Sequence, residues 1–197
     1  MRILYVTIRA MVLAFGLLYL TSCCKSDLHG DYLLDTLARK YVLDTSVKSF
    51  DMVDSRGFRE SFTGSGSYSF YEGGNIDRCG VQFRMQMFSA EYISSVNRYY
   101  FGYTVWAGTG QDEAPRLWIH WNNDLFLDYD LQTKSVLNED GQVRVKMLDT
   151  LSVQGQRYTD VLEVDFFSQG WILYIAPPDG LIKIVRPDGI YSERVLR

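Results

Sequence analysis

The chain has 197 residues, of which 47% are hydrophobic and 15% aromatic, so it can bury a sizeable core and does not read as intrinsically disordered. Its formal net charge is −4, and its Lys and Arg residues form no cluster. Because nucleic-acid-binding proteins present a basic face, we do not expect nucleic acid as a partner. The aromatic residues are mainly Tyr and Phe, which favour strands over helices.

The first 22 residues have the features of a bacterial export signal. Arg2 and Arg9 supply positive charge, and residues 11–20 form an uncharged run, MVLAFGLLYL. As a helix this run spans about 15 Å, half of a bilayer core of about 30 Å. It is too short for a permanent membrane helix, so we expect residues 1–22 to be a cleaved signal peptide.

The next residues contain a possible lipid attachment site. The sequence Leu20-Thr21-Ser22-Cys23 resembles the lipobox of bacterial lipoproteins. The resemblance implies that cleavage occurs before Cys23, that the Cys23 thiol accepts a diacylglyceryl group, and that acyl chains anchor the protein to a membrane. Position 24 is Cys rather than the Asp that marks inner-membrane retention in enterobacteria. We therefore expect a lipid-anchored protein of the outer membrane, facing the periplasm or the cell surface.

After the anchor we expect a short tether, residues 23–30, and a single β-rich domain, residues 31–197. In an oxidising compartment Cys24 and Cys79 could pair, or Cys79 could be a small buried side chain; the sequence leaves this open. Asp31 could cap one short helix that places Leu33, Leu34, Leu37 and Tyr41 on one face, with a strand as the alternative.

Alternating apolar and polar residues predict strands in most of the remaining chain, as in 81–87, 143–147 and 161–166. Gly, Pro, Asn and Asp punctuate these runs as turns, at 54–57, 64–66, 72–75, 138–141, 177–180 and 187–189. About ten or eleven short strands result. The predicted fold is all-β, either an antiparallel curved sheet (a half-barrel or β-roll) or a two-layer sandwich.

The final third predicts a β-meander. Its strands are expected at 158–166, 171–176, 181–186 and 190–195, and two Pro/Gly turns join the last three. Because residues 171–176 are apolar on both faces, this strand should be central or covered on both sides.

The same region carries a second resemblance. Residues 155–161, GQRYTDV, and 175–183, IAPPDGLIK, resemble the carboxy-terminal pattern of many uncharacterised lipoproteins of Bacteroidetes-type bacteria. These residues are turn and core types over less than a fifth of the chain. The resemblance therefore implies a shared fold and no particular reaction.

The sequence shows no catalytic or metal-binding constellation, so we expect no cofactor, no metal and no enzymatic activity. His29 lies in the tether, and His120 shares a strand face with Trp118 without a visible partner. Glu163 and Asp165 lie about 7 Å apart on one strand face, a spacing that suits a glycosidase pair but also an ordinary solvated face.

Aromatic residues are the strongest candidate for a binding site. They fill both faces of one predicted strand, 99–106, and continue with Trp118 and Trp121 on the next. One face must pack the core, and the other could stack sugar rings or accept an apolar ligand. The candidate ligand-binding residues are Tyr100, Trp106, Trp118 and Trp121, and the alternative is a strand buried between two layers.

Three functions remain open. The leading expectation is a lipid-anchored, non-enzymatic binding or structural component of the cell envelope, whose partner is a carbohydrate, an apolar ligand or another envelope protein. The alternatives are a carrier of lipid or another apolar molecule, and an envelope hydrolase that uses paired carboxylates.

Overall fold

The computed structural model describes residues 31–73, 83–108, 113–122, 124–138 and 141–195. Contacts divide the chain into a smaller unit, Met1–Asp31 with Tyr71–Arg84, and a larger unit, Tyr32–Phe70 with Met85–Arg197. The predictions on the signal peptide, on lipid attachment to Cys23 and on a Cys24–Cys79 pairing lie outside the described residues, and they stay predictions.

Two contacts of the smaller unit are an ion pair between Arg84 and Asp31 and the close approach of the Phe83 ring to Gly73. Arg84 donates from Nε and Nη2 to the two carboxylate oxygens of Asp31, at 2.8 and 2.6 Å. The hydrogen bonds from Arg84 lower the pKa of the Asp31 carboxyl below its usual value. A Cβ atom on Gly73 would lie 2.4 Å from Cζ of Phe83, so glycine leaves the space that this ring occupies.

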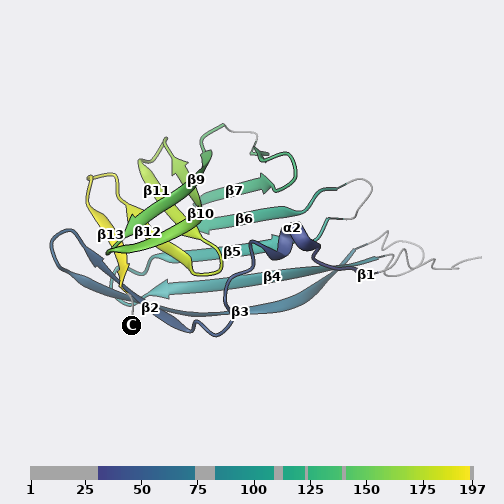
Figure 1. The fold of residues 1–197 in the computed structure, drawn as a ribbon, viewed down its shortest axis with the longest axis horizontal. Coiled ribbons are helices and arrows are strands. Elements are labelled where there is room, and N and C mark those ends of the chain that lie inside the picture. Colours follow the sequence, from purple (N-terminus) through teal and green to yellow (C-terminus); the bar gives the residue numbers. More distant parts are fainter. Residues whose placement is uncertain (1–30, 74–82, 109–112, 123, 139–140, 196–197) are drawn as a thin grey trace, which may run out of the picture. The chain divides into compact units, whose positions relative to one another are not determined.

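Thirteen strands and one short helix make up the described secondary structure (Figure 1). They are β1 (Asp31–Tyr32), α2 (Thr36–Arg39), β2 (Ser49–Asp54), β3 (Arg59–Gly73), β4 (Phe83–Ser94), β5 (Tyr100–Trp106), β6 (Arg116–Trp121), β7 (Leu125–Asp130), β8 (Ser135–Val136), β9 (Arg144–Val153), β10 (Gln156–Phe166), β11 (Trp171–Ala176), β12 (Gly180–Val185) and β13 (Tyr191–Val195).

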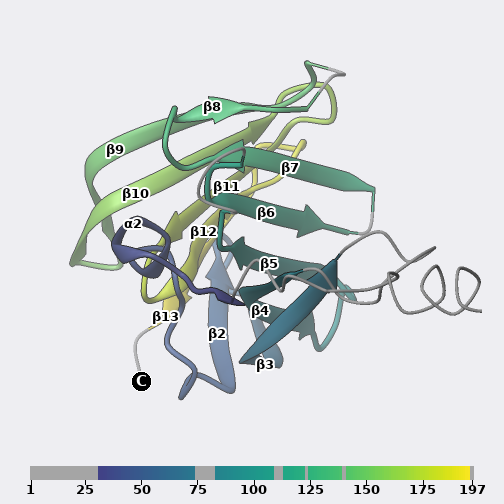
Figure 2. The same ribbon diagram turned by 90° about the vertical axis from the view of Figure 1, so that its right-hand side faces the viewer.

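The strands form one curved antiparallel sheet in the order β8-β7-β6-β5-β4-β3-β2-β13-β12-β11-β10-β9, and β1 pairs with β4. In the larger unit the last strand, β13, pairs with β2, which joins the two halves of the sequence. The ends of this path, β8 and β9, approach each other, so the sheet nearly closes (Figure 2). The prediction of an all-β, antiparallel curved sheet with one short amino-terminal helix is confirmed.

The helix begins later than the sequence suggested. Asp35, not Asp31, is the N-cap, and its Oδ1 accepts a hydrogen bond from the backbone N–H of Ala38 at 2.7 Å. Asp31 instead belongs to β1, and its carboxylate is held by Arg84. The acid that directly precedes the helix, Asp35, therefore caps it.

The concave face of the sheet packs the core. Alternate residues along each strand point inward and are almost completely buried, as period-two alternation predicts. In β4–β7 these residues are Phe88, Tyr92, Phe101, Tyr103, Leu117, Ile119 and Leu127; in β10–β12 they are Leu162, Val164, Leu173, Ile175 and Ile184.

The segment around α2 covers one end of this core. The hydroxyl of Tyr103, which is 1% exposed, donates to the backbone carbonyl of Tyr41 at 2.7 Å. The backbone N–H of Asp44 donates to the carbonyl of Pro178 at 2.9 Å, in the turn that precedes β12. These two bonds attach the segment to strands from both halves of the sheet.

Three aromatic rings close the opposite end. Tyr99, Trp121 and Trp171 form a triangle with ring centroids 5.4–5.5 Å apart, and the guanidinium of Arg186 lies 5.7 Å from the centroid of Tyr99. Trp121 ends β6 and Trp171 begins β11. Tyr99 directly precedes β5, and Arg186 directly follows β12. The triangle therefore connects the two halves across the interior.

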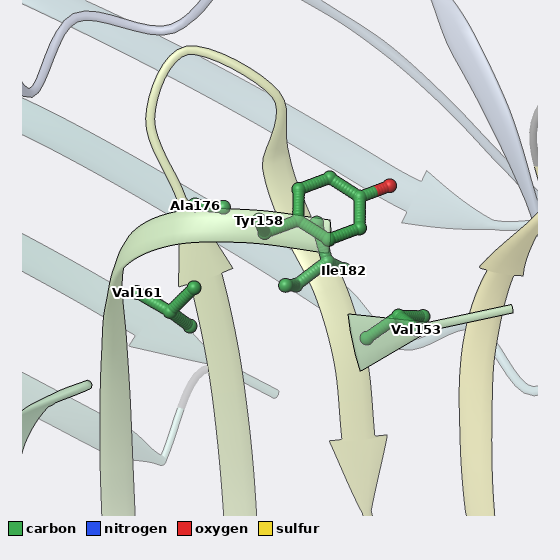
Figure 3. Close-up of a cluster of buried hydrophobic side chains, with 5 residues drawn as sticks. All are labelled: Val153, Tyr158, Val161, Ala176 and Ile182. Carbon is green, nitrogen blue, oxygen red and sulfur yellow. The ribbon is translucent and has the colours of Figure 1, made fainter. Parts of the chain in front are cut away.

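A second, smaller cluster lies where the long β9–β10 hairpin turns (Figure 3). It contains Val153, Tyr158, Val161, Ala176 and Ile182, each no more than 4% exposed. Asp160 has φ +52°, a left-handed conformation that Asp tolerates better than most residues, and it bends β10 beside this cluster.

The turn predicted at Gly64-Ser65-Gly66 is wrong, because β3 continues through all three residues. A Cβ on Gly64 would lie 1.8 Å from the backbone carbonyl oxygen of Glu91, and one on Gly66 would lie 2.7 Å from Cζ of Phe88. Both glycines are therefore required by close approach of β4 and its side chains, not by chain reversal.

The carboxy-terminal meander is confirmed. Strands β10 to β13 pair in sequence order, and β11 lies between β10 and β12 as its apolar sequence predicted. Gly180 and Gly189, in the two Pro/Gly turns, have φ of +88° and +80°, which explains the glycines there.

Candidate functional site

The outward faces of β5, β6 and β7 carry a row of rings, which we call the outer aromatic face: Tyr100, Trp106, Trp118, His120 and Phe126. The strand registers place them together. Trp118 lies opposite Thr104 on β5 and Asp128 on β7, and His120 lies opposite Phe126. Phe126 is 37% exposed, and the other four are partly exposed.

Four of these rings, those of Trp106, Trp118, Phe126 and His120, form a continuous path. The centroids of Trp106 and Trp118 are 4.6 Å apart, those of Trp118 and Phe126 are 5.9 Å apart, and those of Phe126 and His120 are 4.7 Å apart. Because each ring rests on its neighbour, the path is held in place by packing. A preformed aromatic surface of this kind loses little conformational entropy when a flat or apolar ligand binds.

Polar groups border the path at Trp118. Nη1 of Arg116 lies 3.3 Å from Oδ2 of Asp128, and both side chains are only partly exposed. Nε1 of Trp118 and Oδ1 of Asp128 are buried and have no hydrogen-bond partner within the described part of the chain. Both atoms are buried, so the polar group that a ligand can reach at this border is the partly exposed Arg116–Asp128 pair.

Burial determines the ionisation of the two titratable rings. It raises the pKa of Tyr100, with the charge of Glu91 adding to the effect, and it lowers the pKa of His120 below 6.5 despite the opposing effect of Glu91. Both side chains are therefore neutral at pH 7. The outer aromatic face carries no ionised ring at this pH.

Three of the four sequence-predicted aromatics lie on one face of the sheet, and two of them, Trp106 and Trp118, are in contact. Tyr100, Trp106 and Trp118 share the outer aromatic face, whereas Trp121 is 0% exposed and belongs to the inner ring triangle. His120 and Phe126 join the face and were not among the predicted binding residues. The signal was present in the sequence, because a hairpin that pairs residue 121 with residue 125 also pairs residue 120 with residue 126.

The carboxylates Glu163 and Asp165 lie on the outward face of β10. Their cross-strand neighbours on β9 are Lys146 and Arg144, and on β11 Glu163 lies opposite Tyr174. The row continues through Lys183 to Glu193, whose Oε1 is 2.8 Å from Nζ of Lys183. Alternating charges across neighbouring strands are a common way to stabilise a solvated sheet face.

Burial, with a smaller contribution from the charge of Glu163, raises the pKa of Tyr174 to about 12. An unfolded tyrosine loses its proton near pH 10, so between pH 10 and 12 the unfolded state binds fewer protons than the native state. Stability should therefore fall as the pH rises through this window.

We expect urea titrations at pH 8, 10, 11 and 12 to show this fall. Tyr174→Phe should make the fall shallower, and Glu163→Gln should have a smaller effect because burial is the larger cause. Equal slopes for wild type and Tyr174→Phe would contradict the assignment.

Two further features of the described residues bear on function. No group of three or more His, Cys, Asp or Glu side chains in the described ranges could hold a metal ion. Within the same ranges there is no helix long and apolar enough to cross a membrane.

Comparisons with known proteins give no relative. No protein-family model, no curated protein and no solved structure matches this chain. Function must therefore be argued from the chain's own residues.

Proposed function

We propose that this chain is a lipid-anchored lipoprotein of the bacterial cell envelope whose β-rich part is a non-enzymatic binding module. The observation that carries the proposal is the Leu20-Thr21-Ser22-Cys23 sequence directly after the uncharged run of residues 11–20. Small residues before the cysteine suit signal-peptidase cleavage, and the Cys23 thiol would receive the lipid. We place the protein at the outer membrane because Cys24, not Asp, follows Cys23.

Mass spectrometry of the protein purified from bacterial membranes tests the anchor. We expect the mature chain to begin at Cys23 and to carry a diacylglyceryl group on its sulfur, with residues 1–22 removed. A mature protein that keeps its leader, or that starts elsewhere without a lipid, would overturn the proposal.

The outer aromatic face is the binding surface that the geometry supports best, and we propose a carbohydrate as its ligand. Sugars combine apolar ring faces, which stack on aromatic side chains, with hydroxyl groups, which need donors and acceptors. The rings of Trp106 and Trp118 supply the first, while the partly exposed Arg116–Asp128 pair supplies the second.

A glycan array of the full-length protein tests this ligand class. We expect Trp118→Ala to weaken binding of any retained glycan by about tenfold, the loss of one stacked ring. Phe58→Ala is the control, because Phe58 is 46% exposed and lies at the β2–β3 turn, away from β5–β7. Unchanged binding by Trp118→Ala would remove the carbohydrate hypothesis.

The geometry supports the two alternatives less well. A carrier would hold its apolar ligand inside the curved sheet, but the interior is filled by side chains such as Phe88, Phe101 and Tyr103. A carboxylate-pair hydrolase would need Glu163 and Asp165 to converge on a substrate, whereas each lies opposite a basic residue of β9, Lys146 and Arg144 respectively.

A further inference from the structure

Strand β3 is much longer than the strand that pairs with it on one side. Strand β2 pairs with β3 only from Arg59 to Thr63, and the last backbone bond on that side runs from Gly64 N–H to the carbonyl of Lys48, at 2.9 Å. Within the described part of the chain, β2 and β4 are the strands that neighbour β3. From Ser65 to Ser69 the side of β3 away from β4 therefore faces no described strand.

This stretch, which we call the β3 edge (Ser65–Ser69), lacks the features that usually protect an edge. Natural edges are kept from pairing by charged side chains, proline, bulges or short length. Residues 61–71 contain no Asp, Glu, Lys, Arg or Pro. Tyr68 is 53% exposed, and the serines of the β3 edge are exposed as well.

The two ends of the sheet path show the contrast. Strand β8 is two residues long, and β9 carries Arg144, Lys146 and Asp149. Both therefore have one of the usual protections against edge-to-edge pairing.

We propose that the β3 edge pairs antiparallel with the β3 edge of a second copy of this chain, forming a two-fold symmetric dimer. We name a second copy as the partner because the segment Ser65–Ser69 can pair with itself without opposing charges. With Ser67 opposite Ser67 of the other copy, Ser65 lies opposite Ser69 and Gly66 lies opposite Tyr68.

This register avoids the two usual costs of self-pairing. No charge meets a like charge, and each exposed tyrosine ring lies opposite Gly66, which has no side chain of its own and is covered by the ring of Phe88. The ring of Phe88 leans across Gly66, and Tyr68 packs against it with centroids 5.4 Å apart. A second copy would therefore extend an aromatic cluster that is already in place.

Cysteine cross-linking of the full-length chain tests the register, in a Cys24→Ser, Cys79→Ser background that keeps Cys23. Ser67→Cys should form a covalent dimer on mild oxidation, because opposed residues in an antiparallel pair have Cβ atoms about 5 Å apart. Ser65→Cys alone should not, since its two copies are offset by four residues, about 14 Å. A mixture of Ser65→Cys and Ser69→Cys should cross-link.

A charge variant tests the same interface without a covalent bond. Ser67→Lys places two ammonium groups opposite each other and should weaken dimerisation by about tenfold in analytical ultracentrifugation. Thr63→Lys is the control, because Thr63 is an exposed residue of β3 that already pairs with Ser49 of β2. Circular dichroism confirms that each variant is folded.

Three results would overturn the proposal. The first is a wild-type protein that is monomeric at all accessible concentrations. The second is equal cross-linking by Ser65→Cys and Ser67→Cys, which indicates parallel or unspecific pairing. The third is equal weakening by Ser67→Lys and Thr63→Lys.

Discussion

Replacing Cys23 with serine is expected to abolish palmitate labelling and to leave residues 1–22 attached. The thiol is the acceptor of the diacylglyceryl group, and a serine hydroxyl is not a substitute because only the sulfur is a good nucleophile near neutral pH. Each buried methylene contributes about 0.8 kcal/mol, so the loss of the acyl chains removes the main membrane affinity of the mature protein. Metabolic labelling and intact mass measure both effects.

Membrane fractionation alone would be misleading for Cys23→Ser. An uncleaved leader keeps the apolar residues 11–20, which can hold the precursor at a membrane without any lipid. Cys24→Ser is the matched control, since it changes the neighbouring thiol and should be labelled and cleaved like wild type. Labelling of Cys23→Ser at the wild-type level, or its loss in Cys24→Ser, would contradict lipid attachment at Cys23.

Local patterns in the sequence predicted most of the fold. The alternation in 161–166 and the Pro/Gly turns at 177–180 and 187–189 gave the strands and connections of the β10–β13 meander correctly. Such patterns depend on residues close in sequence, whose side-chain period and turn preferences are properties of the backbone itself.

Contacts between distant residues explain the errors. Gly64 and Gly66 have the composition of a turn, but their function depends on Glu91 and Phe88, more than twenty residues away. Asp31, the expected cap, lies in β1 and pairs with Arg84, and Asp35 caps the helix in its place. In both cases the residue has a distant partner that a single sequence does not reveal.

The candidate site was predictable in part. Residues 118 and 121 differ by an odd number, so in a strand they must point to opposite faces. The sequence does not reveal which face is inside, because both are aromatic. That choice depends on Trp171, fifty residues further on, whose ring packs against Trp121.

Replacing Trp121 with alanine is expected to lower the free energy of unfolding by about 3–5 kcal/mol, the usual range for a fully buried Trp or Phe. Trp121 is 0% exposed, and its ring lies 5.4 Å from the centroids of both Tyr99 and Trp171. Its removal would leave a cavity where β6 meets β11 across the interior. Guanidinium unfolding of the full-length protein measures the loss.

Two variants separate this packing role from other effects. Trp121→Phe keeps a ring in the core and removes a buried Nε1 that has no partner within the described residues, so its cost should be about 1 kcal/mol or less. Trp118→Ala makes the same change as Trp121→Ala three residues away, but on the outer aromatic face, and should cost about 1 kcal/mol. Equal losses for Trp118→Ala and Trp121→Ala would show that the two faces of β6 are not divided into core and surface, and the outer aromatic face would then lose its standing as a binding surface.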